Sequence, residues 1–440
     1  MMFGYYLELA VRSLRRNSVL TALMIAAVGV GIGASMTMLT TLVALSTNPI
    51  PDKSAQLFVP QIDASGYATL HHDVQTLPRM LTYRDAMAFV KEHPGTRRAA
   101  MYRLGLNVKP SQGDRFPVGG RATEADFFAM FEVPFRTGAP WGHNEDAHRD
   151  NVVVLSDRLA GRLFPGADAL GKTINLGKKD YRIIGVLRPW IPTPRFYDAN
   201  AGAYSQDEDF FVPFSTAIER QLQSNDYECN ETERPDDWAG ILSSECPWVQ
   251  FWAELPEAGQ VRDFRSFLQN YAAEQQRQGR FRWLPMVALR DVSGWLANLR
   301  IVPNDVRVNS MIAIGFLIVC LINAVGLMLA KFTSRAVELS VRRALGASRI
   351  NLFLQCVTEA LLVGLLGGML GLGLTAVGLF ALRGLQGVAT KESVAGKLIS
   401  LNGEMVVITL VVAIVATVCS GLYPAWRASR VQPGWQLKAQ

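Results

Sequence analysis

The sequence predicts an α-helical membrane protein with four transmembrane helices and a large α+β domain between the first and the second. Three observations lead to this fold class: four long apolar stretches, basic residues gathered beside them, and one charged region of mixed helix and strand pattern. A bilayer core of about 30 Å is crossed by roughly 20 apolar helical residues, which each stretch approaches or exceeds. The predicted spans are Ser18–Leu45, Ser310–Ala330, Leu352–Leu382 and Met405–Tyr423, and Glu359 is the only carboxylate within them.

The basic residues set the predicted orientation of these spans. Five of them stand in Lys331–Asn351 against a single acid, and a further basic excess lies in Met1–Asn17 and in the tail Pro424–Gln440. Segments rich in Lys and Arg beside a span stay on the cytoplasmic side. Ser46–Asn309, with 30 basic and 33 acidic residues, and the short loop Arg383–Glu404 are therefore expected outside. Placement in a lipid bilayer explains the positive net charge, and no nucleic-acid partner is expected.

The chain is expected to approach its first span along the membrane surface. Leu7, Val11 and Leu14 share one helical face and charged residues share another, which predicts an amphipathic interfacial helix within Met1–Asn17. The apolar run that follows has 28 residues, about twice the apolar region of a cleaved signal peptide. We therefore expect it to remain as a transmembrane helix.

The external domain, Ser46–Asn309, alternates between helix and strand patterns. The segments "LTYRDAMAFVKEHPG", "TEADFFAMF" and "EAGQVRDFRSFLQNYAAEQQ" are predicted helices, whereas "VVVLS", "YRIIGVL" and "PWVQFWAEL" are predicted strands. Cys229 and Cys246 flank a polar loop in this domain, where an oxidising compartment permits a disulfide. A bond between them is predicted, and two unpaired thiols are the alternative.

The segment "GADALGKT", from Gly166 to Thr173, fits the phosphate-binding P-loop pattern G-x-x-x-x-G-K-[ST]. A working P-loop follows a buried strand and opens a helix, whose N-terminus binds the phosphates. Here a short helical pattern, "DRLAGRLF", precedes the segment, and a hairpin pattern, "INLGKKDYRIIGVL", follows it. Because this order is reversed, we interpret the match as accidental and expect no bound cofactor and no enzymatic activity in this chain.

We predict no catalytic residue and no metal site. His143 and His148 stand near carboxylates in "WGHNEDAHRD", but their spacing fits no metal-binding pattern. Neither a Ser/His/Asp nor a Cys/His arrangement for nucleophilic catalysis can be supported.

The segment Lys331–Asn351 combines charges with a glycine. Glu338 and Arg342 are spaced i, i+4, so they can pair on one face of a short helix. Arg343 adds a guanidinium suited to a carboxylate of a partner, and Gly346 can end the helix. Taken alone, these residues are more simply interpreted as charges that orient the neighbouring spans, with a glycine that caps the helix.

The third predicted span is dense in glycine. Gly364 and Gly368 form one small-xxx-small pair, and Gly367 and Gly371 form another. Such pairs allow helix backbones to approach closely in a bilayer. The spans lack the histidines and multiple carboxylates of a proton relay, so we expect a tightly packed, movable bundle.

Two segments of the sequence resemble one family. "LFPGADALGKTINLGKKDYRIIGVL" (Leu163–Leu187) is similar to the strand-forming run of a MacB-type periplasmic core domain. "AVELSVRRALGASRINLFLQCVTEALLVGLLGGMLGLGL" (Ala336–Leu374) closely resembles the cytoplasmic loop and third span of MacB/FtsX/LolC-type ABC transporter permeases. "GGRATEADFFAMFEVPFRTGAPW" and "YPAWRASRVQP" are also similar to that family.

This resemblance implies a particular fold and a coupling site. The external domain would be MacB-like and periplasmic, with ferredoxin-like halves and an inserted subdomain near Pro189–Pro247. The segment Glu338–Arg349 would contain a short helix that docks onto an ABC ATPase. The residues matching this coupling motif are Glu338, Arg342, Arg343, Gly346, Ala347 and Arg349.

The resemblance also implies partners. MacB carries a fused ATPase ahead of its first span, whereas 17 residues precede the span here, so we expect a separate ATPase subunit that binds ATP and Mg²⁺. We further expect a second permease copy or paralogue in a bacterial inner membrane, with a periplasmic adaptor (membrane fusion protein) and an outer-membrane channel completing an efflux assembly. FtsX-like mechanotransmission to a periplasmic enzyme and LolC/LolE-like lipoprotein extraction are the alternatives.

Overall fold

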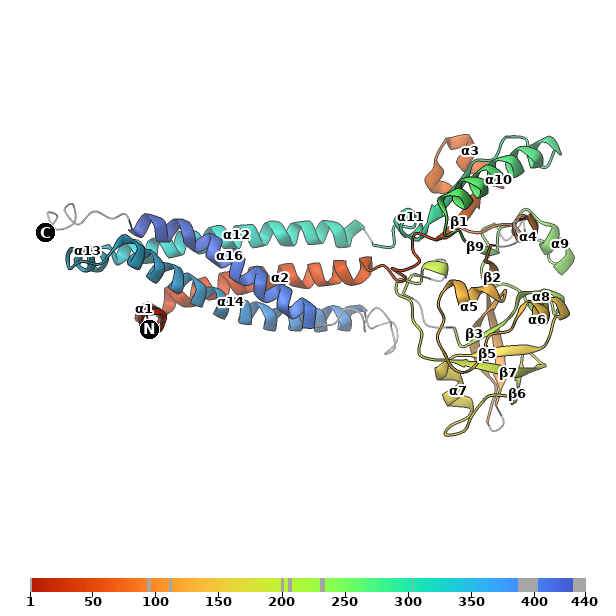
Figure 1. The fold of residues 1–440 in the computed structure, drawn as a ribbon, viewed down its shortest axis with the longest axis horizontal. Coiled ribbons are helices and arrows are strands. Elements are labelled where there is room, and N and C mark those ends of the chain that lie inside the picture. Colours follow the sequence, from red (N-terminus) through yellow and green to blue (C-terminus); the bar gives the residue numbers. More distant parts are fainter. Residues whose placement is uncertain are drawn as a thin grey trace. The chain divides into compact units, whose positions relative to one another are not determined.

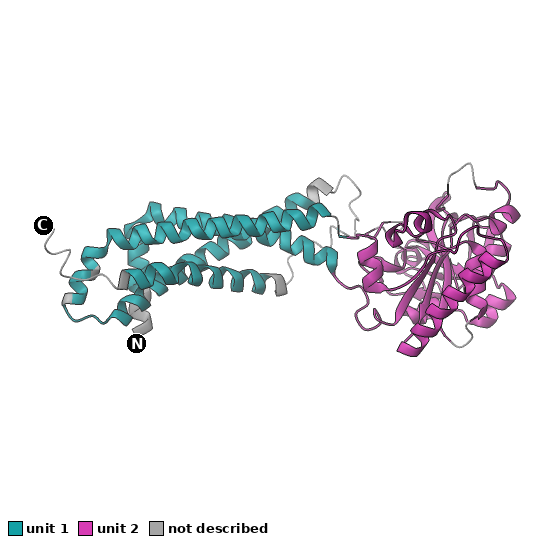
Figure 2. Ribbon diagram, turned by 90° about the horizontal axis from the view of Figure 1, so that it is seen from above, with its two compact units in different colours: residues 1–46, 302–440 teal, residues 47–301 magenta. Residues whose placement is uncertain are grey.

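The computed structural model forms two compact units, Met1–Ser46 with Val302–Gln440 and Thr47–Ile301 (Figure 2). It describes residues 2–92, 96–110, 113–198, 202–204, 208–229, 234–302, 304–386 and 403–429. Most of the predicted loop Arg383–Glu404 and the end of the predicted tail lie outside these described residues.

The first unit is a bundle of helices (Figure 1). Four of them, α2, α12, α14 and α16, are long and apolar enough to cross a membrane. They extend beyond the apolar stretches of the sequence, because backbone hydrogen bonding continues where the side chains become polar. The helices are α1 (Met2–Arg16), α2 (Ser18–Ser46), α12 (Asn304–Ser334), α13 (Ala336–Ala344), α14 (Arg349–Gln386) and α16 (Gly403–Ser429).

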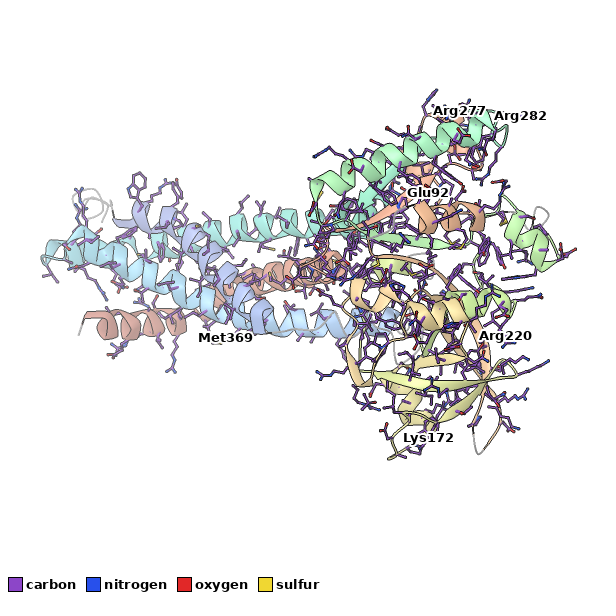
Figure 3. All side chains as sticks on the ribbon, turned by 45° about the vertical axis from the view of Figure 1, so that its right-hand side comes forward. Glu92, Lys172, Arg220, Arg277, Arg282 and Met369 are labelled. Atoms are coloured by element: carbon purple, nitrogen blue, oxygen red, sulfur yellow. A yellow bond between two sulfur atoms is a disulfide. The ribbon has the colours of Figure 1, made fainter. Side chains whose placement is uncertain are left out.

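The bundle buries small and apolar side chains between its helices. Val28 and Ile32 of α2 pack in one core cluster with Ala324 of α12 and Ala413 of α16. Large apolar side chains also point outward, as Met369 does on the surface of the bundle (Figure 3). Such outward residues match a lipid environment, where an apolar surface carries no penalty.

The second unit is built on one ten-stranded mixed sheet with the order β10-β1-β9-β2-β3-β8-β5-β7-β4, and β6 pairs with β2 and β7. Most neighbouring pairs are antiparallel, whereas β3 with β8 and β5 with β7 are parallel. The strands are β1 (Leu57–Ile62), β2 (Arg98–Lys109), β3 (Phe116–Thr123), β4 (Phe135–Gly138), β5 (Val152–Leu155), β6 (Thr173–Leu176), β7 (Lys179–Leu187), β8 (Phe210–Pro213), β9 (Gln250–Glu254) and β10 (Val287–Asp291).

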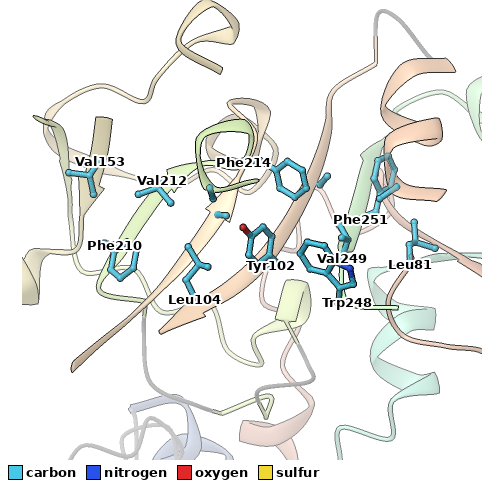
Figure 4. Packing of buried hydrophobic residues seen from close by; sticks show 14 of the residues in the cluster. Leu81, Tyr102, Leu104, Val153, Phe210, Val212, Phe214, Trp248, Val249 and Phe251 are labelled. Atoms are coloured by element: carbon cyan, nitrogen blue, oxygen red, sulfur yellow. The ribbon is translucent and has the colours of Figure 1, made fainter. Parts of the chain in front are cut away.

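Both faces of the sheet are covered. Side chains alternate between the faces along a strand, so Tyr102 and Leu104 join one core cluster, whereas Met101 joins the other. Figure 4 shows part of the first cluster, with Trp248 and Tyr102 packed edge to face. The continuous apolar run of β5 is explained by burial on both faces.

Helices cover the two faces of the sheet. The three helices predicted from the sequence correspond to α4, α5 and α10, and the three predicted strands correspond to β5, β7 and β9. Phe89 of α4 and Phe264 of α10 pack on the first cluster, whereas Phe127 of α5 packs on the second. The helices are α3 (Tyr67–His71), α4 (Tyr83–Glu92), α5 (Asp126–Met130), α6 (His143–His148), α7 (Asp157–Leu163), α8 (Phe214–Glu219), α9 (Trp238–Ser243), α10 (Ala258–Arg277) and α11 (Val292–Asn298), with single 3₁₀ turns at η1 (Val74–Thr76) and η2 (Phe196–Asp198).

A buried ionic network joins four segments of this domain: β3, η2, β9 and the residues just before β8. Arg121 of β3 is fully buried and donates from Nε to Glu208 Oε1 at 3.0 Å and from Nη1 to Gln250 Oε1 at 2.5 Å. Its Nη2 also bonds Asp198, and the Tyr197 hydroxyl donates to Glu208 Oε2 at 2.8 Å. A buried arginine is tolerated only with such complete pairing, so the network fixes where β3, η2 and β9 meet.

The ionised Glu208 carboxylate is predicted to stabilise this domain at neutral pH and to lose that effect in acid. Burial acts to raise its pKa, but the charges of Arg195 and Arg121 and its hydrogen bonds outweigh burial and lower the pKa from 4.5 to about 2. Because the folded pKa is the lower one, this stabilisation is present above about pH 4.5 and is lost as the pH falls toward 2. In thermal unfolding followed by tryptophan fluorescence, Glu208→Gln should melt below the wild type near neutral pH. The gap should narrow in acid, and a gap independent of pH would contradict the assignment.

Candidate functional site

The short helix α13 joins the ends of α12 and α14 at the end of the bundle where α1 also lies (Figure 1). Its C-terminus is closed by a Schellman motif, as Gly346 N–H donates to Arg343 O at 3.1 Å and Ala347 N–H donates to Arg342 O at 3.1 Å. Gly346 has a φ of 101°, which explains why a glycine stands there. The chain turns back, and Arg349 is the first residue of α14.

Glu338 is the hub of the charged face of α13. Its carboxylate lies 3.1 Å from Arg342, 3.2 Å from Arg335 and 3.3 Å from Arg16 of α1. Arg342 also donates to Gln355 of α14 at 3.3 Å. Partial burial acts to raise the Glu338 pKa, but the hydrogen bonds and charge of Arg335, with Arg342 and Arg16, lower it overall. The i, i+4 pair expected from the spacing is present within α13, and the contacts with Arg16 and Gln355 hold the helix onto α1 and α14.

Three apolar side chains of α13 and its C-terminal cap, next to the charged residues, are exposed. Val337, Val341 and Leu345 follow one another at intervals of four residues, and Leu345 is 83% exposed. We call these three residues the apolar row. Sequence reasoning selected only the charges of this helix, although the i, i+4, i+8 spacing of Val and Leu was the signal that could have revealed the row. Adjoining exposed apolar side chains mark a surface suited to contact with another protein or with lipid.

Beneath α13, a carboxylate is buried in the bundle. Glu359 of α14 is 3% exposed and its Oε1 accepts from Arg335 Nη1 at 3.0 Å. Lys331 of α12 is 1% exposed, and its Nζ lies 3.2 Å from Glu359 Oε2 in an ion pair. Sequence reasoning recorded Glu359 only as the single acid of the spans, since its partners lie 24 and 28 positions away.

The glycine pairs of α14 face two different helices. A Cβ built on Gly367 would lie 2.8 Å from Val28 of α2, and one on Gly371 would lie 2.8 Å from Ile32. The second pair meets α16, where a Cβ on Gly368 would lie 2.8 Å from Ala413. Gly364 is likewise against α16, at Thr417. One pair therefore brings α14 to α2 and the other brings it to α16.

The cysteines and the P-loop-like segment lie in the second unit. A disulfide joins Cys229 and Cys246, whose Cα atoms are 5.3 Å apart on either side of α9. "GADALGKT" connects α7 to β6, which is the helix-to-strand order predicted from the sequence. Lys172 is exposed on the domain surface and lies over the Phe164 ring (Figure 3). No helix N-terminus is present at this segment to bind a phosphate.

His143, which the sequence analysis did not expect to bind a metal, borders a polar cleft of about 440 Å³. Its Nε2 lies 3.5 Å from Asp126 Oδ1. Burial raises the pKa of Glu124 to about 8 and that of Asp146 to about 6 in this cleft. Within the described part of the chain, no group of three or more His, Cys, Asp or Glu residues could hold a metal ion.

The bundle has four helices that can span a membrane, and a large domain is inserted after the first of them. A short charged helix, α13, connects the second to the third. These features define a multi-span permease. The chain belongs to the family of the MacB-like periplasmic core domain, whose model matches residues 21–245. Residues 310–433 match the FtsX-like permease C-terminal model. The periplasmic domain between the first two spans and the four-span bundle are therefore those of a MacB/FtsX-like permease.

Curated relatives agree with this assignment. The macrolide export ATP-binding/permease protein MacB of Syntrophobacter fumaroxidans is 26% identical over 476 residues, covering 98% of this chain and 63% of the relative. The MacB of Bordetella avium is 25% identical over 416 residues, covering 94% of this chain and 55% of the relative. The chain thus spans less than two thirds of the length of these relatives.

Solved structures of periplasmic or extracellular regions also match. The periplasmic region of MacB from Actinobacillus actinomycetemcomitans aligns with a TM-score of 0.36 and 12% identity, covering 55% of this chain and 92% of that one. The extracellular domain of the ABC-type transporter YknZ from Gram-positive bacteria aligns with a TM-score of 0.34 and 11% identity, covering 52% and 99%.

The glycine contacts predict opposite effects for two substitutions in one helix. Gly371→Ala places a methyl group against Ile32, and such overpacking costs about 1–3 kcal/mol. Gly373→Ala is the matched control, because a Cβ there meets nothing within 4 Å and the helix gains about 0.5–1 kcal/mol from replacing glycine. Melting temperatures in detergent should fall for Gly371→Ala and hold or rise for Gly373→Ala. Equal shifts in both variants would refute the packing role.

Proposed function

We propose that this chain is the transmembrane permease subunit of a MacB-like ABC transporter. ATP hydrolysis by a separate ATPase subunit, which binds ATP and Mg²⁺, would move the periplasmic domain and drive export across the cell envelope. The subunit would reside in a bacterial inner membrane with both termini and α13 in the cytoplasm. A second copy or a paralogue would complete the membrane part.

The observation that carries this proposal is the two-sided construction of α13. Its charged face is fixed to α1 and α14 through Glu338 and Arg342, and its apolar row faces outward. A helix that couples two proteins must be held firmly on one side and must offer a surface on the other. Partly exposed Arg343, in the last turn of α13, would supply a planar positive group suited to a carboxylate of the ATPase.

The bundle supports movement of helices more than passage of a polar solute. α14 touches α2 and α16 through glycines, so these helices pack closely and can shift as bodies. Glu359 is paired with Lys331 and Arg335 at one end of the bundle, and so it does not line an open polar path. This arrangement suits export by motion of the periplasmic domain, and it suits mechanotransmission to a periplasmic enzyme equally.

Co-purification tests the coupling role. Tagged protein from mild-detergent membranes should recover an ABC ATPase, and Leu345→Glu should reduce that recovery about tenfold or more. Burying a Leu side chain contributes about 1.5–3 kcal/mol, and about 1.4 kcal/mol corresponds to a factor of ten in binding. The matched control is Leu284→Glu in the periplasmic domain, where Leu284 is 54% exposed. This control should leave recovery of the ATPase unchanged. An equal loss of ATPase in both variants would contradict the role of the apolar row in binding it.

The same experiment separates the functional alternatives by what accompanies the ATPase. A periplasmic adaptor and an outer-membrane channel in the recovered material would support efflux. A cell-wall hydrolase would support mechanotransmission, and a lipoprotein chaperone would support lipoprotein extraction. Recovery of no ATPase by the wild type under any detergent condition would overturn the proposed function.

A further inference from the structure

The ends of four helices meet at one buried cluster of charges. Glu359 lies in the third turn of α14, Lys331 near the end of α12, and Arg335 at the junction of α12 with α13. Arg335 also hydrogen-bonds Ser13 of α1. Contacts from α1, α12, α13 and α14 therefore converge on three neighbouring charged side chains.

The contacts form a continuous chain from α13 into α14. Glu338 of α13 accepts from Arg335 Nη2 at 3.2 Å, and Arg335 Nη1 donates to Glu359 of α14 at 3.0 Å. The Arg335 guanidinium thus holds one carboxylate from each helix with separate nitrogens. A planar guanidinium fixes both distance and angle between its partners, which a single ammonium would not do.

Burial makes this chain of contacts stiff. An ionised side chain inside a membrane bundle is tolerated when it is paired, and removing one partner leaves an uncompensated charge. Glu359 pairs with both Lys331 and Arg335, and Arg335 also pairs with Glu338, so each buried charge of the cluster has an opposite charge beside it. Lys331, Arg335 and Glu359 would each lose a buried partner on separation, so α13 and α14 are expected to move together.

We propose that Glu359 is a positioning residue that fixes α13 to α14 through Arg335 and transmits displacement of α13 into the third span. The proposal rests on the proposed function of α13 as the helix that receives the ATPase. Lys331 serves a different purpose in this arrangement: it neutralises Glu359 from α12 but does not touch α13. The roles of the two cations can therefore be separated by substitution.

The decisive comparison uses two variants that both remove buried charge. Lys331→Met/Glu359→Met deletes a neutral pair, leaves Arg335 with Glu338, and breaks the bridge to α14. Lys331→Met alone is the matched control, because it keeps the Arg335–Glu359 contact. Replacing a buried pair with apolar residues preserves folding more reliably than removing one partner of the bridge, which is why Glu359→Gln alone is a weaker test.

The first readout needs no ATPase. In full-length protein with Cys320, Cys356 and Cys419 replaced by alanine, a spin label at Val341→Cys reports the mobility of α13. The label should gain mobility in the double variant and keep wild-type mobility in Lys331→Met, and the melting temperature of each variant checks that the bundle is still folded. Unchanged mobility in the double variant would overturn the inference whether or not an ATPase binds.

The second readout uses the complex with the co-purified ATPase. Labels at Met311→Cys and Phe380→Cys, both strongly exposed, report the distance between α12 and α14 near their other ends. ATP with vanadate should change this distance in the wild type and in Lys331→Met. The double variant should still recover the ATPase but lose the change. A full distance change in the double variant would refute transmission through Glu359, whereas failure of the wild type to recover an ATPase would refute only the proposed function.

Discussion

The bundle depends on the contact between the backbones of α2 and α14. In a bilayer, apolar side chains gain nothing by leaving lipid for protein, so helices associate by close packing and hydrogen bonding. The fit is reciprocal: Val28 and Ile32 of α2 occupy the space over Gly367 and Gly371, and Leu370 of α14 occupies the space over Gly29. Neither helix could carry larger residues at these positions without separating from the other. The glycines that look like weak points in a helix are therefore what gives the bundle its contact surface.

This packing explains why the charged cluster lies where it does. α14 meets α2 on one side and α16 on another, so its glycine-rich middle has no room for a long charged side chain and its partners. Glu359 precedes the first of these glycines, where α12, α13 and α1 bring Lys331, Arg335 and Ser13 within reach. α14 therefore packs closely against its neighbours in the middle and forms ion pairs at one end. Close packing leaves no space for the ion pairs, and the charged side chains would prevent close packing.

The features predicted from sequence are those that depend on neighbours along the chain. Four apolar stretches give four helices, and the i, i+4 spacing of Glu338 and Arg342 gives an ion pair. Glu359 with Arg335, and Arg121 with Gln250, escape such reasoning because the partners lie 24 and 129 positions apart. Periodicity also shows that Gly364, Gly367, Gly368 and Gly371 are packing residues, but two interleaved pairs do not reveal that each serves a different helix. That assignment requires the positions of α2 and α16 in space.

α13 departs from the usual arrangement of a surface helix, because large apolar side chains are among its most exposed residues. An exposed helix ordinarily turns apolar residues inward and charges outward. Here the Glu338 carboxylate pairs with Arg335 and Arg16, and Arg342 hydrogen-bonds Gln355. The apolar row, in contrast, faces away from the fold. This arrangement leaves apolar surface exposed unless another molecule covers it. In the proposed function, the charges conspicuous in the sequence orient the helix, and contact with an ATPase would fall to the apolar row and Arg343. A partner selected in this way would be held by burial, and the ionic network beneath would carry its motion into the spans.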